Sequence, residues 1–163
     1  MRKILLAGAV AAAVAAATVL TGAASATSAG EGPMRLTAKA AAVAFVTPCR
    51  TCLQSQPPGI HMGAVAYESG KLLNGRGVKV GHFAISATQV TPVAAGAPGE
   101  LLLDITLVLA AGQITAHGIE EPPDNAGTIA INGGTGAYQS VRGEIHFRDA
   151  GPGTTLLRVA TER

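Results

Sequence analysis

The run Ile131–Tyr138 constrains the fold more than any other part of the chain, because it places Gly133, Gly134, Thr135 and Gly136 between two segments of strand-like composition. A phosphate-binding glycine loop opens a helix, and no helical pattern follows this run. Glycine tolerates the backbone angles of a tight reversal. We therefore predict a structural turn at Gly133, Gly134 and Gly136 that joins two β-strands.

From residue 35 onward, apolar or alternating segments are separated by turn residues, which is typical of β-strands. The pair Asn74-Gly75 predicts a hairpin turn. The first segment also fits a helix, but its β-branched and aromatic residues favour a strand. Short antiparallel strands in this number predict an all-β domain, either a closed eight-stranded antiparallel β-barrel or a sandwich. The eight predicted strands are Leu36–Val46, His61–Glu68, Val78–Val90, Glu100–Ala110, Gln113–Ile119, Thr128–Ile131, Val141–Asp149 and Thr154–Ala160.

Residues 1–26 have the three parts of a secretory signal peptide. Arg2 and Lys3 form a positive start, an Ala-rich apolar stretch runs on to Leu20, and residues 24–26 read Ala-Ser-Ala, which fits a cleavage site. A membrane anchor is the alternative, but alanine is weakly apolar and the cleavage site favours removal. We therefore expect a secreted protein without a stable membrane anchor.

Removal of this signal peptide changes the net charge of the chain and leaves a tail and a domain. The whole chain has 12 Lys+Arg and 10 Asp+Glu, so the loss of Arg2 and Lys3 makes it formally neutral. Aromatic residues make up only 3% of the chain, and no basic block remains. We therefore expect no nucleic-acid partner. The mature chain is predicted to have a flexible tail at 27–34 and one β-barrel domain at 35–163.

The two faces of the predicted strand Glu100–Ala110 differ in polarity. Leucine and isoleucine occupy every position of one face, whereas the other face carries Leu102, Asp104, Thr106 and Val108. The outer wall of a monomeric barrel is expected to be largely polar. The apolar residues on the second face therefore favour cover by another copy, that is, a homo-oligomer. A strand buried inside a sandwich is the alternative.

Further motifs surround the glycine run: Gly77–Gly81 and Gly112–Gly118 precede it, and Val141–Glu144 follows it. Together with the run they resemble the allene oxide cyclase and dirigent barrel superfamily, over most of the chain from Met62 to Ala160. The resemblance implies an eight-stranded antiparallel barrel, commonly a trimer, with an apolar lumen that holds a small apolar molecule. Plant members of the superfamily steer or catalyse cyclisation and coupling, and bacterial relatives include cyclases.

The chain also departs from this superfamily. The acidic pair of the first strand in plant dirigent proteins is missing, since Leu36–Val46 contains no acid. Gly127 occupies the place of an arginine that often precedes the glycine turn. An acid after the strand Gln113–Ile119 is retained as Glu120 or Glu121. The barrel is therefore a firmer expectation than the dirigent mechanism.

Three residues are candidates for catalysis: Asp104, Glu120 and Tyr67. A charge at Asp104 between two apolar neighbours requires a partner, so it is either a lumen acid or a paired acid on the outer wall. The resemblance supports Glu120, which is otherwise a solvated turn residue. The hydroxyl of Tyr67 is suited to donate to a ligand oxygen. The alternating residues Arg142–Arg148 are typical of a solvated charged face.

The remaining motifs concern cysteine and histidine. A lone cysteine pair in an exported protein favours a disulfide, so we predict a Cys49–Cys52 bridge, with redox and zinc roles as alternatives. The four histidines show no metal-ligand spacing, and we expect neither a metal site nor a cofactor.

Three functions remain open: an exported barrel that binds a small apolar molecule, an isomerase or cyclase that acts on such a molecule, and an inert oligomeric scaffold. We favour the first. An open lumen that carries an acid would favour the second, and a lumen filled by aliphatic side chains would favour the third.

Overall fold

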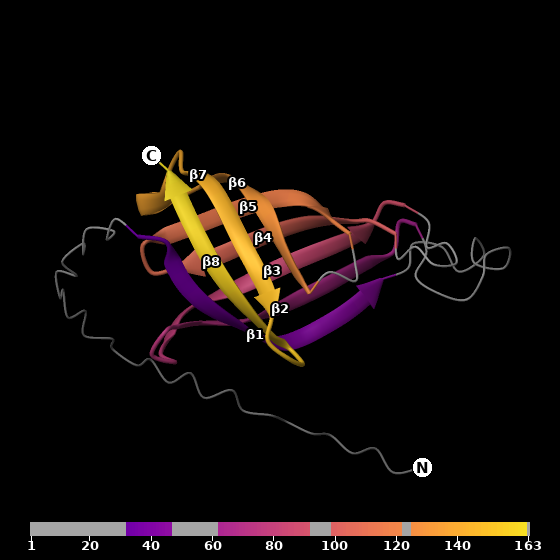
Figure 1. Ribbon diagram of the computed structural model, residues 1–163, viewed down its shortest axis with the longest axis horizontal. Coiled ribbons are helices and arrows are strands. Elements are labelled where there is room, and N and C mark those ends of the chain that lie inside the picture. The colour runs from indigo at the N-terminus through magenta and orange to yellow at the C-terminus, as the bar shows by residue number, and fades with distance from the viewer. Residues whose placement is uncertain (1–31, 47–61, 92–98, 122–124, 163) are drawn as a thin grey trace, which may run out of the picture. The chain divides into compact units, whose positions relative to one another are not determined.

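The computed structural model describes residues 32–46, 62–91, 99–121 and 125–162. These residues form a closed barrel in which each strand pairs antiparallel with its neighbours in sequence, and β8 pairs with β1 to complete the ring (Figure 1). The prediction of an all-β, eight-stranded antiparallel barrel is therefore confirmed, and the sandwich is excluded. The strands are β1 (Met34–Val46), β2 (Val65–Asn74), β3 (Lys79–Gln89), β4 (Leu101–Leu109), β5 (Gly112–Glu120), β6 (Ala126–Gly134), β7 (Arg142–Asp149) and β8 (Thr154–Glu162).

Every predicted strand is present, but β2 is longer than expected and ends at the turn. The predicted strand ended at Glu68, whereas β2 continues to Asn74. The Asn74 carboxamide oxygen accepts hydrogen bonds from the backbone N–H groups of Arg76 and Val78, both at 3.0 Å, which confirms the predicted hairpin turn. Position 70 within this strand requires glycine, because a Cβ there would lie 2.0 Å from the carbonyl oxygen of Lys39 on β1.

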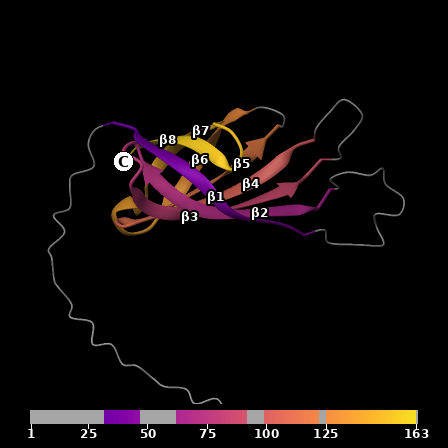
Figure 2. The ribbon, with the colours of Figure 1, turned by 90° about the horizontal axis from the view of Figure 1, so that it is seen from below.

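Alternation along each strand divides the barrel into an inner face and an outer wall. On β4, Leu103, Ile105 and Leu107 point inward and are buried, whereas Asp104 on the opposite face is exposed. The predicted polarity of the two faces is therefore confirmed. Figure 2 shows β8, β1, β2 and β3 side by side along one wall. The largest fully buried side chains are Phe83, Leu72, Leu107, Ile114, Ile129, Ile145 and Val159.

One end of the barrel, at which β1 begins and β8 ends, is closed by the connection from β6 to β7. A short 3₁₀ helix, η2 (Gly136–Tyr138), lies against the β4–β5 turn, where the Ala137 N–H donates to the carbonyl oxygen of Ala111 at 2.8 Å. Val141 follows and is only 4% exposed. We call this the closed end, and the opposite end the mouth.

The glycine run is therefore only partly the turn that was predicted. Gly133 and Gly134 are the last residues of β6, and the chain reverses after them. Gly136 does lie in the reversal, with φ at +62°. A Cβ on Gly134 would lie 2.4 Å from the carbonyl oxygen of Gln113, so this glycine permits the close approach of β5 rather than a turn.

Several expectations fall on residues outside the described ranges. These are the signal peptide at 1–26, most of the tail at 27–34, and the Cys49–Cys52 bridge. Within the described residues, no helix is long and apolar enough to cross a membrane.

Candidate functional site

The mouth half of the barrel contains a cavity of about 250 Å³. Its walls are mostly apolar side chains that point inward from β3 and β4. The lining residues are Ala38, Glu68, Phe83, Ile85, Ala87, Leu101, Leu103, Ile105, Leu107, Glu120, Phe147, Asp149, Thr155 and Leu157. The lumen is therefore hollow at the mouth, whereas the closed end is filled by buried side chains.

Small residues in register explain why the mouth half is hollow. Ala66 on β2 lies opposite Ala87 on β3, which lies opposite Leu103 on β4, and Leu103 lies opposite Gly118 on β5. Three of these four inward positions carry a methyl group or no side chain at all. At the closed end, the corresponding space is taken by large residues such as Leu72 and Ile114, both fully buried.

Three carboxyl groups from three strands face this cavity: Glu68 on β2, Glu120 on β5 and Asp149 on β7. Glu120 is paired in register with Leu101 at the rim. Asp149 is also at the rim, is exposed, and accepts a hydrogen bond from the Thr155 hydroxyl at 3.4 Å. Glu68 lies one inward position further from the mouth than Ala66 on β2, and its register partners are Val43 on β1 and Ile85 on β3.

The electrostatic surroundings of Glu68 favour its neutral form. Burial among apolar side chains raises the pKa of the Glu68 carboxyl above its usual 4.5, and the negative charge of Asp149 raises it further. Both effects penalise the ionised carboxylate. A carboxyl group whose pKa is raised is better suited to donate a proton to a bound molecule.

Of the three predicted catalytic residues, only Glu120 lines the cavity. Asp104 is not a lumen acid: it lies on the outer wall, and its Oδ1 is 2.7 Å from Nδ1 of His117 on β5. Tyr67 also faces outward and is 49% exposed. Both corrections follow from strand alternation, since each residue neighbours an inward-facing residue in the sequence.

Glu68 and Asp149 were missed by the sequence analysis. Each was placed at the last position of a predicted strand, Glu68 in His61–Glu68 and Asp149 in Val141–Asp149, and neither was considered as a site residue. A signal was nevertheless present for Glu68. Leu72 must be buried, and counting back by two from it gives Gly70 and then Glu68 on the inner face.

A buried glutamine holds the mouth in shape. Gln89, at the end of β3, is 2% exposed, and its Nε2 donates to the carbonyl oxygens of Thr91 at 2.7 Å and Glu100 at 3.2 Å. The Thr91 hydroxyl in turn accepts a hydrogen bond from the Glu100 N–H at 2.6 Å. These bonds fix the entry of β4 beside the cavity. Among the described residues, no three His, Cys, Asp or Glu side chains are placed to hold a metal ion.

Comparison with known proteins identifies the fold. No family model matches the sequence, and no curated protein matches it. A pyocyanin demethylase is similar with a TM-score of 0.67 and 24% identity, over 80% of this chain and 99% of that one. An exo-specific intermolecular Diels-Alderase has a TM-score of 0.59 and 14% identity, over 80% of this chain and 92% of that one. A pterocarpan synthase dirigent protein has a TM-score of 0.56 and 16% identity, over 79% of this chain and 90% of that one. The resemblance found in the sequence is thus confirmed at the level of fold: the chain has the same barrel fold as a dirigent protein and a Diels-Alderase.

Proposed function

We propose that this protein binds a small apolar molecule in its lumen and that the Glu68 carboxyl assists an isomerisation or cyclisation of that molecule. The observation that carries the proposal is a carboxyl group of raised pKa that lines a mostly apolar cavity together with Glu120 and Asp149. An inert scaffold would have no reason to keep the mouth half hollow or to place an acid there.

Binding follows from the shape and polarity of the cavity. Apolar walls on β3 and β4 favour transfer of an apolar molecule out of water. A cavity of about 250 Å³ restricts the ligand to a compact shape. Confinement of a flexible substrate in one folded conformation lowers the entropic cost of closing a ring.

The carboxyl groups divide the proton transfers between them. In its protonated form Glu68 donates a proton to an oxygen or an unsaturated carbon of the substrate, and the substrate loses a proton elsewhere to a carboxylate, for which Asp149 at the rim is placed. Asp149 then releases its proton to water and Glu68 takes one up, which restores both groups for the next turnover. Isomerisation and intramolecular cyclisation rearrange bonds within one molecule, so no atoms are gained or lost. Exclusion of water by the apolar walls protects reactive intermediates from hydrolysis.

The similar structures support the reaction class without deciding it. A Diels-Alderase and a pterocarpan synthase dirigent protein both have names that denote ring formation. A demethylase of pyocyanin has the same fold, so the reaction of this chain depends on its own carboxyl groups.

The test compares the native protein with Glu68→Gln, which keeps the size of the side chain but cannot supply an acidic proton. Each protein is incubated with an apolar extract of its source culture, and the captured molecules are released and separated by chromatography with mass detection. We expect Glu68→Gln to retain a molecule that the native protein returns as an isomer of the same mass and different retention time. Asp104→Asn, on the outer wall, is the matched control and behaves as native.

Two outcomes separate the alternatives. Recovery of the same unchanged molecule from both proteins would reject the reaction at Glu68 and support binding alone. Binding itself is tested with N-phenyl-1-naphthylamine, a neutral probe that fluoresces in apolar surroundings. Absence of a fluorescence change with the native protein would reject binding in the lumen.

Oligomerisation and export complete the proposal. A cross-strand row on the outer wall near the mouth consists of Val46, Val65, Thr88, Leu102 and Ile119, in register across β1 to β5. Val46 is 51% and Ile119 57% exposed, so a second copy that covers this row would remove apolar surface from water. Native mass spectrometry of protein secreted into the medium tests both the subunit number, expected to be three, and cleavage after residue 26.

A further inference from the structure

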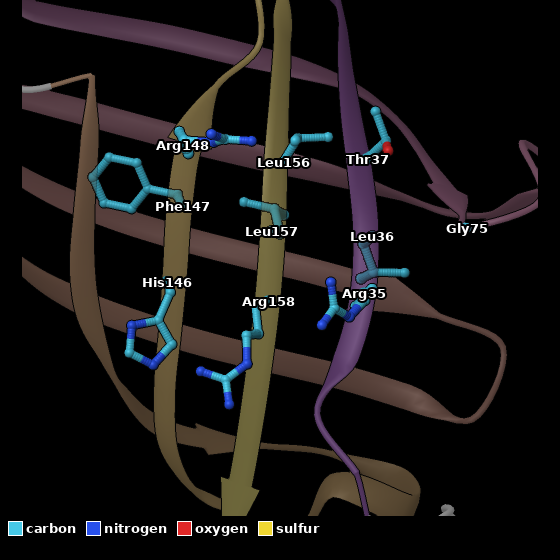
Figure 3. Close-up of a pocket in the computed structure, with 10 residues that line it drawn as sticks. All are labelled: Arg35, Leu36, Thr37, Gly75, His146, Phe147, Arg148, Leu156, Leu157 and Arg158. Atoms are coloured by element: carbon cyan, nitrogen blue, oxygen red, sulfur yellow. The ribbon is translucent and has the colours of Figure 1, made fainter.

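A cluster of basic side chains lies on the outer wall of β7, β8 and β1. Arg35 on β1 is the direct register partner of Arg158 on β8, and Arg158 is the direct partner of His146 on β7. Figure 3 shows the Arg158 side chain beside His146 and the Arg35 side chain directed toward Arg158. Arg148 lies two residues beyond His146 on the same face. We call these four residues the arginine groove.

This arrangement is unfavourable for the empty protein. Like charges directly opposite one another across neighbouring strands destabilise a sheet. Within the described residues, no carboxylate lies within ion-pair distance of Arg35, Arg148 or Arg158, and the Glu144 carboxylate contacts only His146, at 3.3 Å. The three guanidinium groups therefore lie on one wall without a counter-ion among the residues that the structure describes.

Other positions of the outer wall differ. Arg142 on β7 is in register with Glu162 on β8, and Asp104 on β4 is in register with His117 on β5, with their side chains 2.7 Å apart. Lys39 on β1, however, opposes Lys71 on β2, so the arginine pair is one of two such like-charged pairs among the described strands. A bound anion would supply the negative charge that Arg35 and Arg158 lack.

The wall is concave at this place. The groove has a volume of about 370 Å³, which is the size of a small-molecule site. Leu156 lies in register between Thr37 and Arg148 and is 37% exposed, so the groove floor offers an apolar surface beside the guanidinium groups. Guanidinium groups bind phosphate through paired hydrogen bonds, and several cations around one site favour a group of more than one negative charge.

We propose that the arginine groove binds an organic phosphate: the phosphate lies between Arg35 and Arg158, and an apolar body lies on Leu156 beside Arg148. The site is separate from the lumen, so it does not depend on the function proposed for the cavity. The phosphate stabilises the barrel because it replaces the repulsion between the opposed arginines with attraction.

The test is isothermal titration calorimetry with phenyl phosphate at constant ionic strength, together with thermal unfolding. We expect phenyl phosphate to bind more tightly than inorganic phosphate, and Arg158→Gln to weaken binding by about tenfold or more. The same substitution raises the melting temperature of the ligand-free protein, because it relieves the repulsion from Arg35. Arg142→Gln removes an equal charge from the same wall outside the groove and is the control, with native affinity.

Three results would overturn the proposal. The first is an unchanged affinity in both Arg158→Gln and Arg35→Gln. The second is equal binding of phenyl phosphate and inorganic phosphate, which would make the ligand free phosphate and leave Leu156 without a role. The third is binding to vesicles of anionic phospholipid without binding to phenyl phosphate, which would identify a membrane surface instead.

Discussion

Filling the lumen by Ala87→Leu tests whether the mouth half of the barrel is hollow. Ala87 points inward from β3 and lines the cavity, and its register partners on the inner face are Ala66 and Leu103. The substitution adds three carbon atoms toward a space of about 250 Å³. In a hollow lumen these atoms are buried without displacing a neighbour.

The size of the effect follows from the buried carbons. Each buried methylene contributes about 0.8 kcal/mol, so three contribute about 2.4 kcal/mol. Fixing the leucine rotamer opposes this by roughly 0.5–1 kcal/mol. We expect Ala87→Leu to raise the free energy of unfolding by about 1.5 kcal/mol. The same side chain occupies the ligand's place, so binding of N-phenyl-1-naphthylamine is lost although the protein is more stable.

Ala116→Leu is the matched control. Ala116 points inward from β5, is 2% exposed, and does not line the cavity. Insertion of the same three carbons into filled space costs about 1–3 kcal/mol. Urea unfolding of both variants therefore gives changes of opposite sign. A loss of stability in Ala87→Leu as large as that in Ala116→Leu would refute a hollow lumen.

Three further predictions concern single residues. The folded protein favours the protonated form of Glu68, because the pKa of this carboxyl is raised above 4.5. The free energy of unfolding of the native protein therefore falls relative to that of Glu68→Gln as pH rises from 4.5 through the raised pKa. Urea titrations at a series of pH values measure this difference. Asp104→Asn leaves probe fluorescence in the lumen unchanged, since Asp104 contacts His117 on the outer wall. Gly143→Ala lowers the free energy of unfolding by about 2–4 kcal/mol, because its φ is +130° and the new Cβ would lie 2.0 Å from the carbonyl oxygen of Ala160, as thermal unfolding would show.

The number and order of strands could be predicted from the sequence because turn chemistry is local. Asn74-Gly75 and Gly151-Pro152-Gly153 end strands wherever they occur, and both do so here. The end of the glycine run could not be predicted in the same way. Gly134 is needed because β5 and the end of η2 approach the backbone of β6 there, and such an approach between distant segments leaves no local pattern.

The candidate site was predicted less completely, since it depends on which face each acid occupies. Asp104 shares a face with Leu102, and that mixed face is the outer wall, so alternation alone could have removed Asp104 from the candidates. Glu68 and Tyr67 are adjacent and therefore point to opposite sides. The choice between them requires the buried anchor Leu72 on the same strand, and the gathering of Glu68 with Asp149 requires the closed ring.

The order of the strands has a consequence for biosynthesis. Every pairing joins strands adjacent in sequence except the one between β1 and β8. Each hairpin can therefore form as soon as its second strand has been synthesised, whereas Met34 meets Val159 only at the end. Until then the nascent sheet has two unpaired edges that can recruit strands from other chains. Closure by β8 is expected to limit the folding rate, and chains that lack β8 are expected to aggregate rather than to remain as a smaller stable sheet.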